Sequence, residues 1–307
     1  MKLVILSAGP DTAGCGIALK QAFDKYTDWQ TRAICRKQVY LDYDSDIVWP
    51  KGDPGLTEQV MEIVRAADVI HVMDYEYALG PFRDMLAGKT IVVHHLGSYF
   101  RRDPAGVSAK AKAYGAIQVT DSIDLLLFPW ITWLPVTTDL DAMAAIRKRV
   151  YRPSERIRIA HAPTNRELKS TDAIISAVEW LATQYPIDLD VIEQVPSRME
   201  VLERKAAADI FVDQLNLGFG VNCIEAWGMS VPVVSGWKDD EPRRKCFEMW
   251  GYLPWADATE KTLADVIELL ILNPERRAEL GEVGRQHAQK WHSQKSVVEQ
   301  TLAIYGI

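Results

Sequence analysis

Short apolar runs alternate with longer amphipathic stretches along the whole chain. Short apolar runs are typical of strands buried in a parallel sheet, and amphipathic stretches are typical of the helices that cover it. In the first half, the runs predict strands at 2–7, 31–35, 69–73, 90–94, 116–120 and 125–128. The amphipathic stretches there predict helices at 16–25 and 57–66, with Asp11 or Thr12 capping the first and Thr57 starting the second. The expected fold class is therefore α/β.

The alternation pauses near residue 150. A last strand is expected at 132–136 and a short helix at 139–149, followed by the linker-like stretch Arg152-Pro153-Ser154-Glu155. We therefore expect residues 1–150 to form a first Rossmann-like domain.

The alternation then restarts. Strands are expected at 157–160, 187–192, 210–212 and 232–235, and helices at 170–184, 199–206, 222–228, 263–270, 274–289 and 296–304. This pattern predicts a second Rossmann-like domain at 151–290 and a closing segment at 291–307.

Composition narrows the class of protein. The 307 residues are 48% hydrophobic and carry a net charge of −7, which gives no general attraction for nucleic acid or anionic membranes, although a local basic patch is compatible with it. The four cysteines are scattered, as expected for reduced thiols, and no apolar run approaches the roughly 20 residues of a membrane span. The apolar start of the chain is too short for a signal peptide. We expect a cytoplasmic enzyme without stable membrane insertion.

The segment 208–234 contains the most informative chemistry. A strand ending at Val212 leads through a loop with Gly218 and Gly220 into a helix. Glycines let a ligand approach the backbone, and the free N–H groups at a helix start suit a diphosphate. Glu225, about one turn inside the helix, could accept two hydrogen bonds from a ribose diol. The alternative is an ordinary turn followed by a solvated carboxylate.

This segment resembles the donor site of retaining glycosyltransferases of the GT-B fold, particularly family 4. The matching residues are Gly218-Phe219-Gly220, Glu225-Ala226 and Val231-Pro232-Val233-Val234. The closing helices from Asn273 onward are also similar to those of the family, in which the last helix returns to the N-terminal domain.

The resemblance implies two Rossmann-like domains that face each other across a cleft, and a diphosphate site that includes Gly218, Phe219 and Gly220. It also implies sugar transfer from a UDP- or GDP-linked donor with retention, without a metal and without any cofactor besides the nucleotide sugar. Leu217 stands where the family usually has a Glu that contacts the donor sugar, so the identity of the sugar stays open.

A second match lies in the loop after the expected strand 157–160. Lys169 stands where the family has a diphosphate-binding Lys, and Ser170 where a Gly is common. Thr164 occupies the usual Arg position, with Arg166 as a nearby substitute. Fixed cations are needed here because the leaving nucleoside diphosphate gains negative charge in the transition state. The alternative is a basic surface turn.

The first half offers weaker candidates. Gly14 and Gly16 resemble the family's glycine-rich loop facing the cleft, although a simple tight turn explains them equally well. The resemblance also implies a His near the reacting sugar at the end of the expected strand 90–94, which makes a histidine there the candidate catalytic residue. His95 is the first choice and His94 the second, because strand alternation sends one of the two into the core. A structural histidine is the alternative.

Four other polar residues follow the expected strands 69–73 and 90–94. Ser98 and Arg101 are expected on the acceptor or sugar side. Asp74 and Glu76, which follow the expected strand 69–73, could bind acceptor hydroxyls, but solvated loop carboxylates are the favoured interpretation.

No convincing D-x-D metal motif is present; the nearest is Asp42-Tyr43-Asp44-Ser45-Asp46, so no metal is expected. The expected acceptor is a glycan, a lipid-linked hydroxyl or a small-molecule hydroxyl, with a nucleic-acid base as an alternative. Two rival functions stay open: a nucleotide-sugar epimerase of the same fold, and a nucleotide-sugar-binding protein with weakened or lost catalysis.

Overall fold

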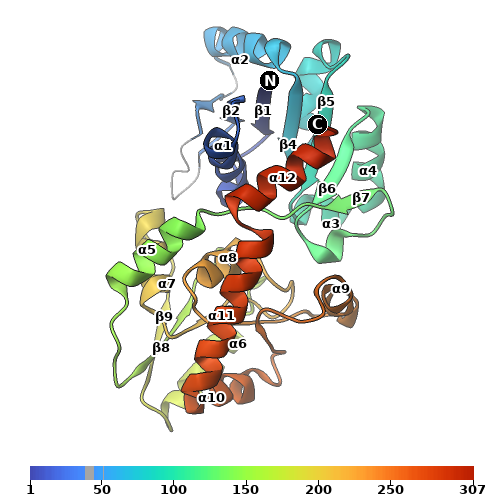
Figure 1. The fold of residues 1–307 in the computed structure, drawn as a ribbon. Helices are drawn as coiled ribbons and strands as arrows, with labels where there is room; N and C mark the ends of the chain where they lie inside the picture. The colour runs from blue at the N-terminus through green and yellow to red at the C-terminus, as the bar shows by residue number, and fades with distance from the viewer. Residues whose placement is uncertain (39–44, 51) are drawn as a thin grey trace. The chain divides into compact units, whose positions relative to one another are not determined.

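The computed structural model describes residues 1–38, 45–50 and 52–307. The chain divides into two compact units (Figure 1). Unit 1 comprises Met1–Thr137 together with Gln294–Ile307, and unit 2 comprises Thr138–Ser293.

Unit 1 is built on a seven-stranded sheet in the order β3-β2-β1-β4-β5-β6-β7, in which every pairing is parallel. The strands are β1 (Lys2–Ser7), β2 (Gln30–Cys35), β3 (Ile47–Val48), β4 (Val69–Met73), β5 (Thr90–His95), β6 (Ile117–Thr120) and β7 (Ile131–Trp133). The strand order changes direction between β1 and β4. In open α/β sheets, ligands bind beyond the carboxyl ends of the strands at such a point.

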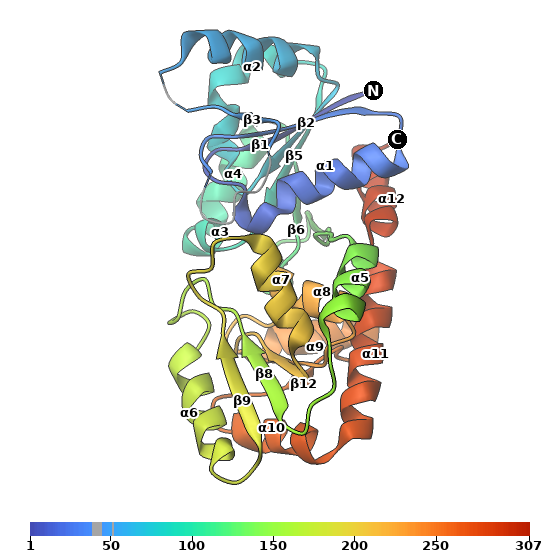
Figure 2. The same cartoon turned by 90° about the vertical axis from the view of Figure 1, so that its left-hand side faces the viewer.

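Helices cover both faces of this sheet (Figure 2). They are α1 (Cys15–Tyr26), α2 (Pro54–Ala66), α3 (Ser98–Arg102), α4 (Pro104–Ala113) and α12 (Gln294–Tyr305), with 3-10 turns at Thr12–Gly14, Glu76–Met85 and Ile123–Leu125. On one face, Ile70 and Val72 of β4 pack with residues of α2 in a single hydrophobic cluster. His71 lies between them in sequence, so it faces the other side, where its Nδ1 lies 2.8 Å from the Tyr305 hydroxyl of α12.

The α12 helix packs against α1 within unit 1. The Tyr305 ring stacks on Phe23 of α1 and on Trp29, with centroid separations of 6.1 and 6.0 Å. The last turn of the chain is therefore part of the unit 1 core.

Unit 2 repeats the plan with five parallel strands in the order β12-β11-β10-β8-β9. The strands are β8 (Ile157–His161), β9 (Ile187–Val191), β10 (Ile210–Val212), β11 (Val233–Ser235) and β12 (Ala256–Asp257). The helices are α5 (Leu140–Val150), α6 (Thr171–Ala182), α7 (Arg198–Ala207), α8 (Val221–Gly228), α9 (Asp240–Trp250), α10 (Leu263–Leu272) and α11 (Pro274–Trp291). One hydrophobic cluster of its core consists of aliphatic side chains mainly from the strands, α6 and α10. Large buried aromatic side chains such as Phe211, Trp227 and Trp255 lie outside that cluster. In neither unit is a described helix both long and apolar enough to cross a membrane.

Five elements, β3, α3, α4, α9 and β12, were not expected from the sequence. Three of the sequence expectations also differ from the structure. The expected strand at 125–128 is wrong: Ile123–Leu125 is a 3-10 turn, and the strand is β7. Asp53, rather than Thr57, caps α2, because its side chain accepts a hydrogen bond from the Leu56 N–H and Pro54 occupies a favoured first-turn position. Helix α5, which the sequence placed in the first domain, belongs to unit 2 because it packs on α7 and α8.

Candidate functional site

The turn between β10 and α8 has a backbone that only glycine fits at one position. Gly218 has φ +71°, and a Cβ atom there would lie 2.1 Å from the Trp237 ring. The turn is fixed by the Gly218 N–H, which donates to the Gly236 carbonyl at 2.8 Å, and by the Ser235 hydroxyl, which donates to the Gly218 carbonyl. The sequence therefore shapes a rigid approach to the start of α8.

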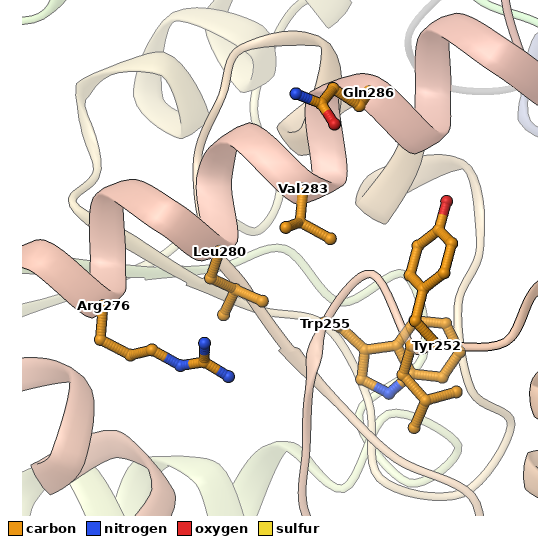
Figure 3. Close-up of a pocket in the computed structure, with 7 residues that line it drawn as sticks. Tyr252, Trp255, Arg276, Leu280, Val283 and Gln286 are labelled. Atoms are coloured by element: carbon orange, nitrogen blue, oxygen red, sulfur yellow. The ribbon is translucent and has the colours of Figure 1, made fainter.

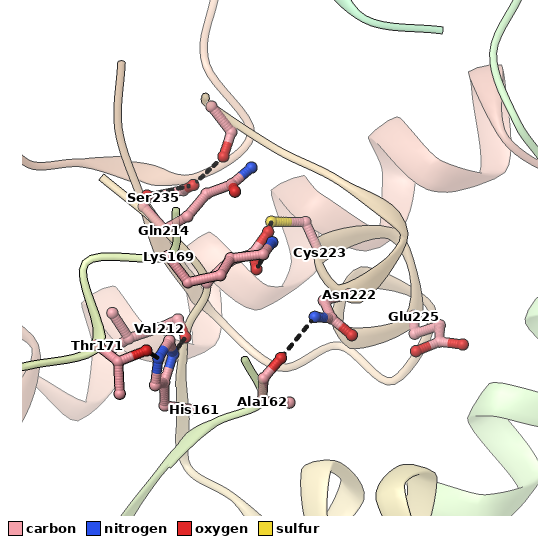
Figure 4. Close-up of polar contacts among 12 residues, drawn as sticks. His161, Ala162, Lys169, Thr171, Val212, Gln214, Asn222, Cys223, Glu225 and Ser235 are labelled. Carbon is pink, nitrogen blue, oxygen red and sulfur yellow. Dashed lines mark hydrogen bonds and ion pairs between the residues drawn. The ribbon is translucent and has the colours of Figure 1, made fainter. Parts of the chain in front are cut away.

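The start of α8 offers free backbone donors and a cation. Gly220 precedes the helix, no side chain among the described residues caps it, and its first turn contains no acid. The Lys169 ammonium is held 2.7 Å from Asp213 Oδ1, and the Cys223 thiol in the first turn of α8 donates to Asp213 Oδ2 at 3.0 Å (Figure 4). A helix N-terminus with a lysine anchored beside it suits an anion.

The charges of this group are set by its surroundings. Burial alone would raise the pKa of the Asp213 carboxyl, but the Lys169 ammonium outweighs burial and holds that pKa below its usual value. Burial and the neighbouring Asp213 raise the pKa of the Cys223 thiol well above its usual value. Cys223 is therefore a neutral hydrogen-bond donor and not a nucleophile.

Glu225 lies one turn further along α8 and is only 4% exposed. Its Oε2 lies 2.5 Å from the Lys205 ammonium and its Oε1 lies 2.9 Å from the Arg198 guanidinium. Burial alone would raise the pKa of Glu225, but these two cations outweigh it and lower that pKa. Each carboxylate oxygen has a second lone pair, so a ribose hydroxyl can still be accepted beside the cations.

Sequence reasoning missed both Lys205 and Asp213. Lys205 is fully buried, and its ammonium also contacts Asn222 Oδ1, while Asn222 Nδ2 donates to the Ala162 carbonyl at 2.9 Å. A signal for Lys205 was present, because it lies three residues after the buried Leu202 on the apolar face of α7. A lysine on the buried face of a helix requires a partner.

The two predicted cations, Lys169 and Arg166, both lie in the loop between β8 and α6 but have different surroundings. His161 fixes the loop start, with Nδ1 2.8 Å from the Val212 carbonyl and Nε2 2.9 Å from the Thr171 hydroxyl. Ser170 has φ +54°, which explains why glycine suits this position. The structure places Lys169 beside α8, whereas Arg166 is ion-paired with Asp172 and Glu193 at 2.8 Å on the exposed part of the loop.

The glycine-rich loop of unit 1 already holds a carboxylate. Asp11 accepts hydrogen bonds from the Gly16 and Ile17 N–H groups, both at 2.8 Å, and a Cβ atom on Gly16 would lie 2.9 Å from Asp11 Oδ1. Gly14 enters the helix with φ +71°. Because Asp11 uses the N–H groups that a phosphate would need, this geometry favours the tight-turn interpretation.

The expectation that only one of the two histidines is buried is wrong. His94 is 2% exposed and His95 is 0% exposed, because helices cover both faces of β5. His94 Nδ1 lies 3.3 Å from His71 Nε2, and His94 lines a small cavity with Cys15, Leu134 and neighbouring residues.

On the opposite face of β5, His95 Nε2 lies 3.0 Å from Gln118 Oε1, and its ring stacks on Phe100. Burial lowers the pKa of His95 to about 4, so its ring is neutral near pH 7.

Of the two acceptor-side candidates, Ser98 is free to contact a ligand, whereas Arg101 is already ion-paired. Ser98 is exposed at the start of α3. Arg101 forms a two-bond ion pair with Asp124, at 2.7 and 2.9 Å, so its charge is already neutralised.

Among the described residues, no group of three or more His, Cys, Asp or Glu side chains is arranged to hold a metal ion. Asp42 and Asp44 of the D-x-D candidate lie outside the described residues.

A cavity of about 400 Å³ lies elsewhere in unit 2, along α11 (Figure 3). It is lined by Tyr252, Leu253, Trp255, Arg276, Leu280, Val283 and Gln286. None of the predicted donor-site residues lines it.

Comparison with solved structures identifies the fold. An alpha-glucosyltransferase in complex with UDP-glucose and DNA containing an abasic site superposes with a TM-score of 0.67 at 9% identity, covering 100% of both chains. HepE (Alr3699) of Anabaena in complex with UDP gives 0.68 at 12% identity over 99% of both chains. UDP-N-acetylglucosamine 2-epimerase gives 0.57 at 14% identity, covering 100% of this chain and 97% of the other.

No family model and no curated protein sequence matches the chain. The predicted fold class is nevertheless confirmed. The chain has a GT-B-like fold with two parallel α/β sheets of seven and five strands.

Proposed function

We propose that the chain is a glycosyltransferase that binds a nucleotide-diphosphate sugar in unit 2 and transfers the sugar to an acceptor hydroxyl. One observation carries the proposal: Lys169 is fixed by Asp213 beside the uncapped start of α8, directly after the Gly218 turn. The diphosphate would bind to Lys169 and to the free N–H groups at the start of α8, while Glu225 would accept the ribose hydroxyls.

This arrangement suits the charge that develops in the reaction. As the bond to the sugar breaks, negative charge accumulates on the leaving nucleoside diphosphate. Lys169 and the partial positive charge of the helix start would stabilise it without a metal. Transfer with retention, in which the donor phosphate assists the incoming hydroxyl on the same face of the sugar, follows from the family 4 resemblance and belongs to this proposal.

The solved relatives support UDP as the nucleotide. HepE is described with UDP and the alpha-glucosyltransferase with UDP-glucose. We extend this nucleotide to the present chain as part of the proposal. His95 is given no role in this proposal, because its ring is fully buried, paired with Gln118 and stacked on Phe100.

An epimerase is the second candidate. The fold is shared with UDP-N-acetylglucosamine 2-epimerase, and Leu217 stands where the family usually places a sugar-contacting Glu. An epimerase would convert its nucleotide sugar without an acceptor, so product analysis in the absence of acceptor separates the two activities.

The decisive experiment measures UDP affinity by calorimetry and hydrolysis of a panel of UDP- and GDP-sugars. We expect UDP to bind, and Lys169→Met to weaken binding at least tenfold, since a charged hydrogen bond contributes about 1.5–3 kcal/mol. Glu225→Gln should weaken the binding of UDP more than the binding of inorganic diphosphate, because diphosphate has no ribose. Lys261→Met, just before α10, and Glu275→Ala, in the first turn of α11, are the matched controls at exposed positions of unit 2. Unchanged UDP affinity in Lys169→Met would overturn the assignment.

A further inference from the structure

A group of aromatic and acidic side chains lies beyond the carboxyl ends of β4 and β5 in unit 1. We call Asp74, Tyr75, Glu76, Tyr77 and Tyr99 the tyrosine–carboxylate cluster. The three rings contact one another, with centroid separations of 5.3 Å for Tyr75 and Tyr77, 4.9 Å for Tyr75 and Tyr99, and 5.8 Å for Tyr77 and Tyr99. Parallel sheets bind ligands at this end of their strands.

Glu76 is 1% exposed and has an unused acceptor atom. Its Oε1 accepts a hydrogen bond from the Tyr99 hydroxyl at 3.0 Å, and the Lys110 ammonium lies 4.0 Å from the same oxygen. Its Oε2 is buried and has no hydrogen-bond partner among the described residues. A buried carboxylate oxygen without a donor is costly, so this position calls for an external hydroxyl or amide.

Asp74 is held in a strained conformation beside it. It is 4% exposed and has φ +69°, a value uncommon for residues other than glycine. Its N–H donates to the His94 carbonyl at 2.8 Å, and its Oδ1 accepts from the Leu96 N–H at 3.2 Å. The expectation that Asp74 and Glu76 are solvated loop carboxylates is therefore wrong, because the three tyrosines and the ends of two strands bury them. Backbone strain of this kind concentrates at functional sites.

We propose that the tyrosine–carboxylate cluster is a saccharide-binding site. Tyr77 is 52% exposed, so part of its ring remains available for packing against the apolar face of a sugar ring. The Glu76 and Asp74 carboxylates accept hydroxyl hydrogen bonds, and the tyrosine hydroxyls both donate and accept them.

A nucleic acid fits this surface poorly. Two carboxylates within one cluster repel phosphates, and the nearby Arg101 is already paired with Asp124. The identification of the bound saccharide as the acceptor rests on the proposed transferase function. Binding of the saccharide to unit 1 does not.

The test is ligand-observed saturation-transfer NMR on the full chain. The probes are maltose, cellobiose, lactose and N,N′-diacetylchitobiose, with the oligonucleotide dT12 as the nucleic-acid probe. We expect at least one disaccharide to bind. Tyr77→Ala and Glu76→Gln should each lower the affinity for that disaccharide at least tenfold. Tyr26→Ala, which removes a similarly exposed tyrosine from α1 in the same unit, should leave it unchanged. Circular dichroism of each variant establishes that the fold is retained.

The proposal is overturned if none of the four disaccharides binds, if Tyr77→Ala binds as tightly as the unmodified chain, or if dT12 competes for the same surface. UDP affinity, measured on the same variants, should not change. Loss of disaccharide binding with UDP binding intact would count against this site alone. Absence of UDP binding with disaccharide binding intact would count against the proposed transferase alone.

Discussion

Lys205 shows how tightly the candidate ribose acid is held. Its ammonium has no exposed surface and is neutralised by Glu225, with Asn222 as a second partner. Breaking a buried ion pair by removing one partner typically costs about 3–5 kcal/mol. Without Lys205, the buried Glu225 carboxylate keeps only the partly exposed Arg198 as a counter-charge.

We therefore expect Lys205→Met to lower the free energy of unfolding by about 3 kcal/mol. Urea denaturation measures this change. Arg149→Ala removes an exposed ion pair with Glu203 and should change stability by less than about 0.5 kcal/mol. The double variant Lys205→Met/Glu225→Gln should lower the free energy of unfolding by less than the sum of the two single variants, since neither of the two buried charges remains. A Lys205→Met variant as stable as Arg149→Ala would contradict this account.

For each of the two ion pairs, Lys169 with Asp213 and Glu225 with Lys205, the sequence predicted only one residue. Lys169 and Glu225 were indicated by the family resemblance; Glu225 lies in α8, and Lys169 is paired with Asp213, which also accepts from Cys223 of α8. Asp213 and Lys205 could not be assigned in the same way, because they are 44 and 20 residues away from their partners in sequence. Asp213 reaches Lys169 because β10 pairs with β8, and Lys205 reaches Glu225 because α7 packs against α8.

The Gly218 turn is the element on which the start of α8 depends. Gly218→Ala would combine a left-handed backbone with a methyl group 2.1 Å from the Trp237 ring. Gly251 has a similar φ of +78°, but nothing lies within 4 Å of its Cβ position, so Gly251→Ala isolates the backbone cost of about 1 kcal/mol.

Gly218→Ala should lower the free energy of unfolding by at least about 2 kcal/mol more than Gly251→Ala does, since an overpacked site typically costs about 1–3 kcal/mol on top of the backbone term. Thermal or urea unfolding of the two variants measures the difference. Equal losses would show that the Trp237 contact does not constrain the turn.

The elements that the sequence missed have identifiable causes. The run at 125–128 has the apolar character of a strand, but Pro129 follows it and Leu127 remains 49% exposed, so the strand forms only at β7. Helix α9 was missed because its eleven residues are mostly polar and only Cys246 among them is buried. Strong periodicity predicted the other helices of unit 2 to within a few residues.

For the whole molecule, alternating strands and helices were sufficient to predict two parallel α/β sheets. The solved relatives preserve this architecture at 9–14% identity, because a buried pattern of apolar residues can be kept by many sequences. The composition of unit 1 could not be predicted from alternation alone, since α12 joins it from the far end of the chain.

All six histidines of the chain are buried, which makes stability sensitive to acid. Burial lowers the pKa of His71 to about 3, of His95 to about 4 and of His287 to about 2, and it also lowers the pKa values of His94 and His161. An unfolded histidine takes up a proton near pH 6.5. The folded state holds these histidines neutral, and the stability that this contributes is fully present above pH 6.5. It is lost as the pH falls, by up to about 1.4 kcal/mol per pH unit for each group.

We expect the midpoint of thermal unfolding to fall by at least about 5 °C between pH 7.5 and pH 5.5, measured by scanning calorimetry. Asp121 acts in the opposite direction, because burial raises its pKa to about 7 and its protonation stabilises the fold as the pH falls. Asp121→Asn should consequently make the decline steeper. A midpoint that rises on acidification would contradict the prediction.

The placement of Tyr305 has a consequence for biosynthesis. Its ring completes the aromatic packing around Phe23 and Trp29, and its hydroxyl is the partner of His71. All of Thr138–Ser293 is translated between these residues and Tyr305. The earlier half of the polypeptide therefore emerges from the ribosome with an apolar edge uncovered, and it can reach its final state only after the later half has been synthesised.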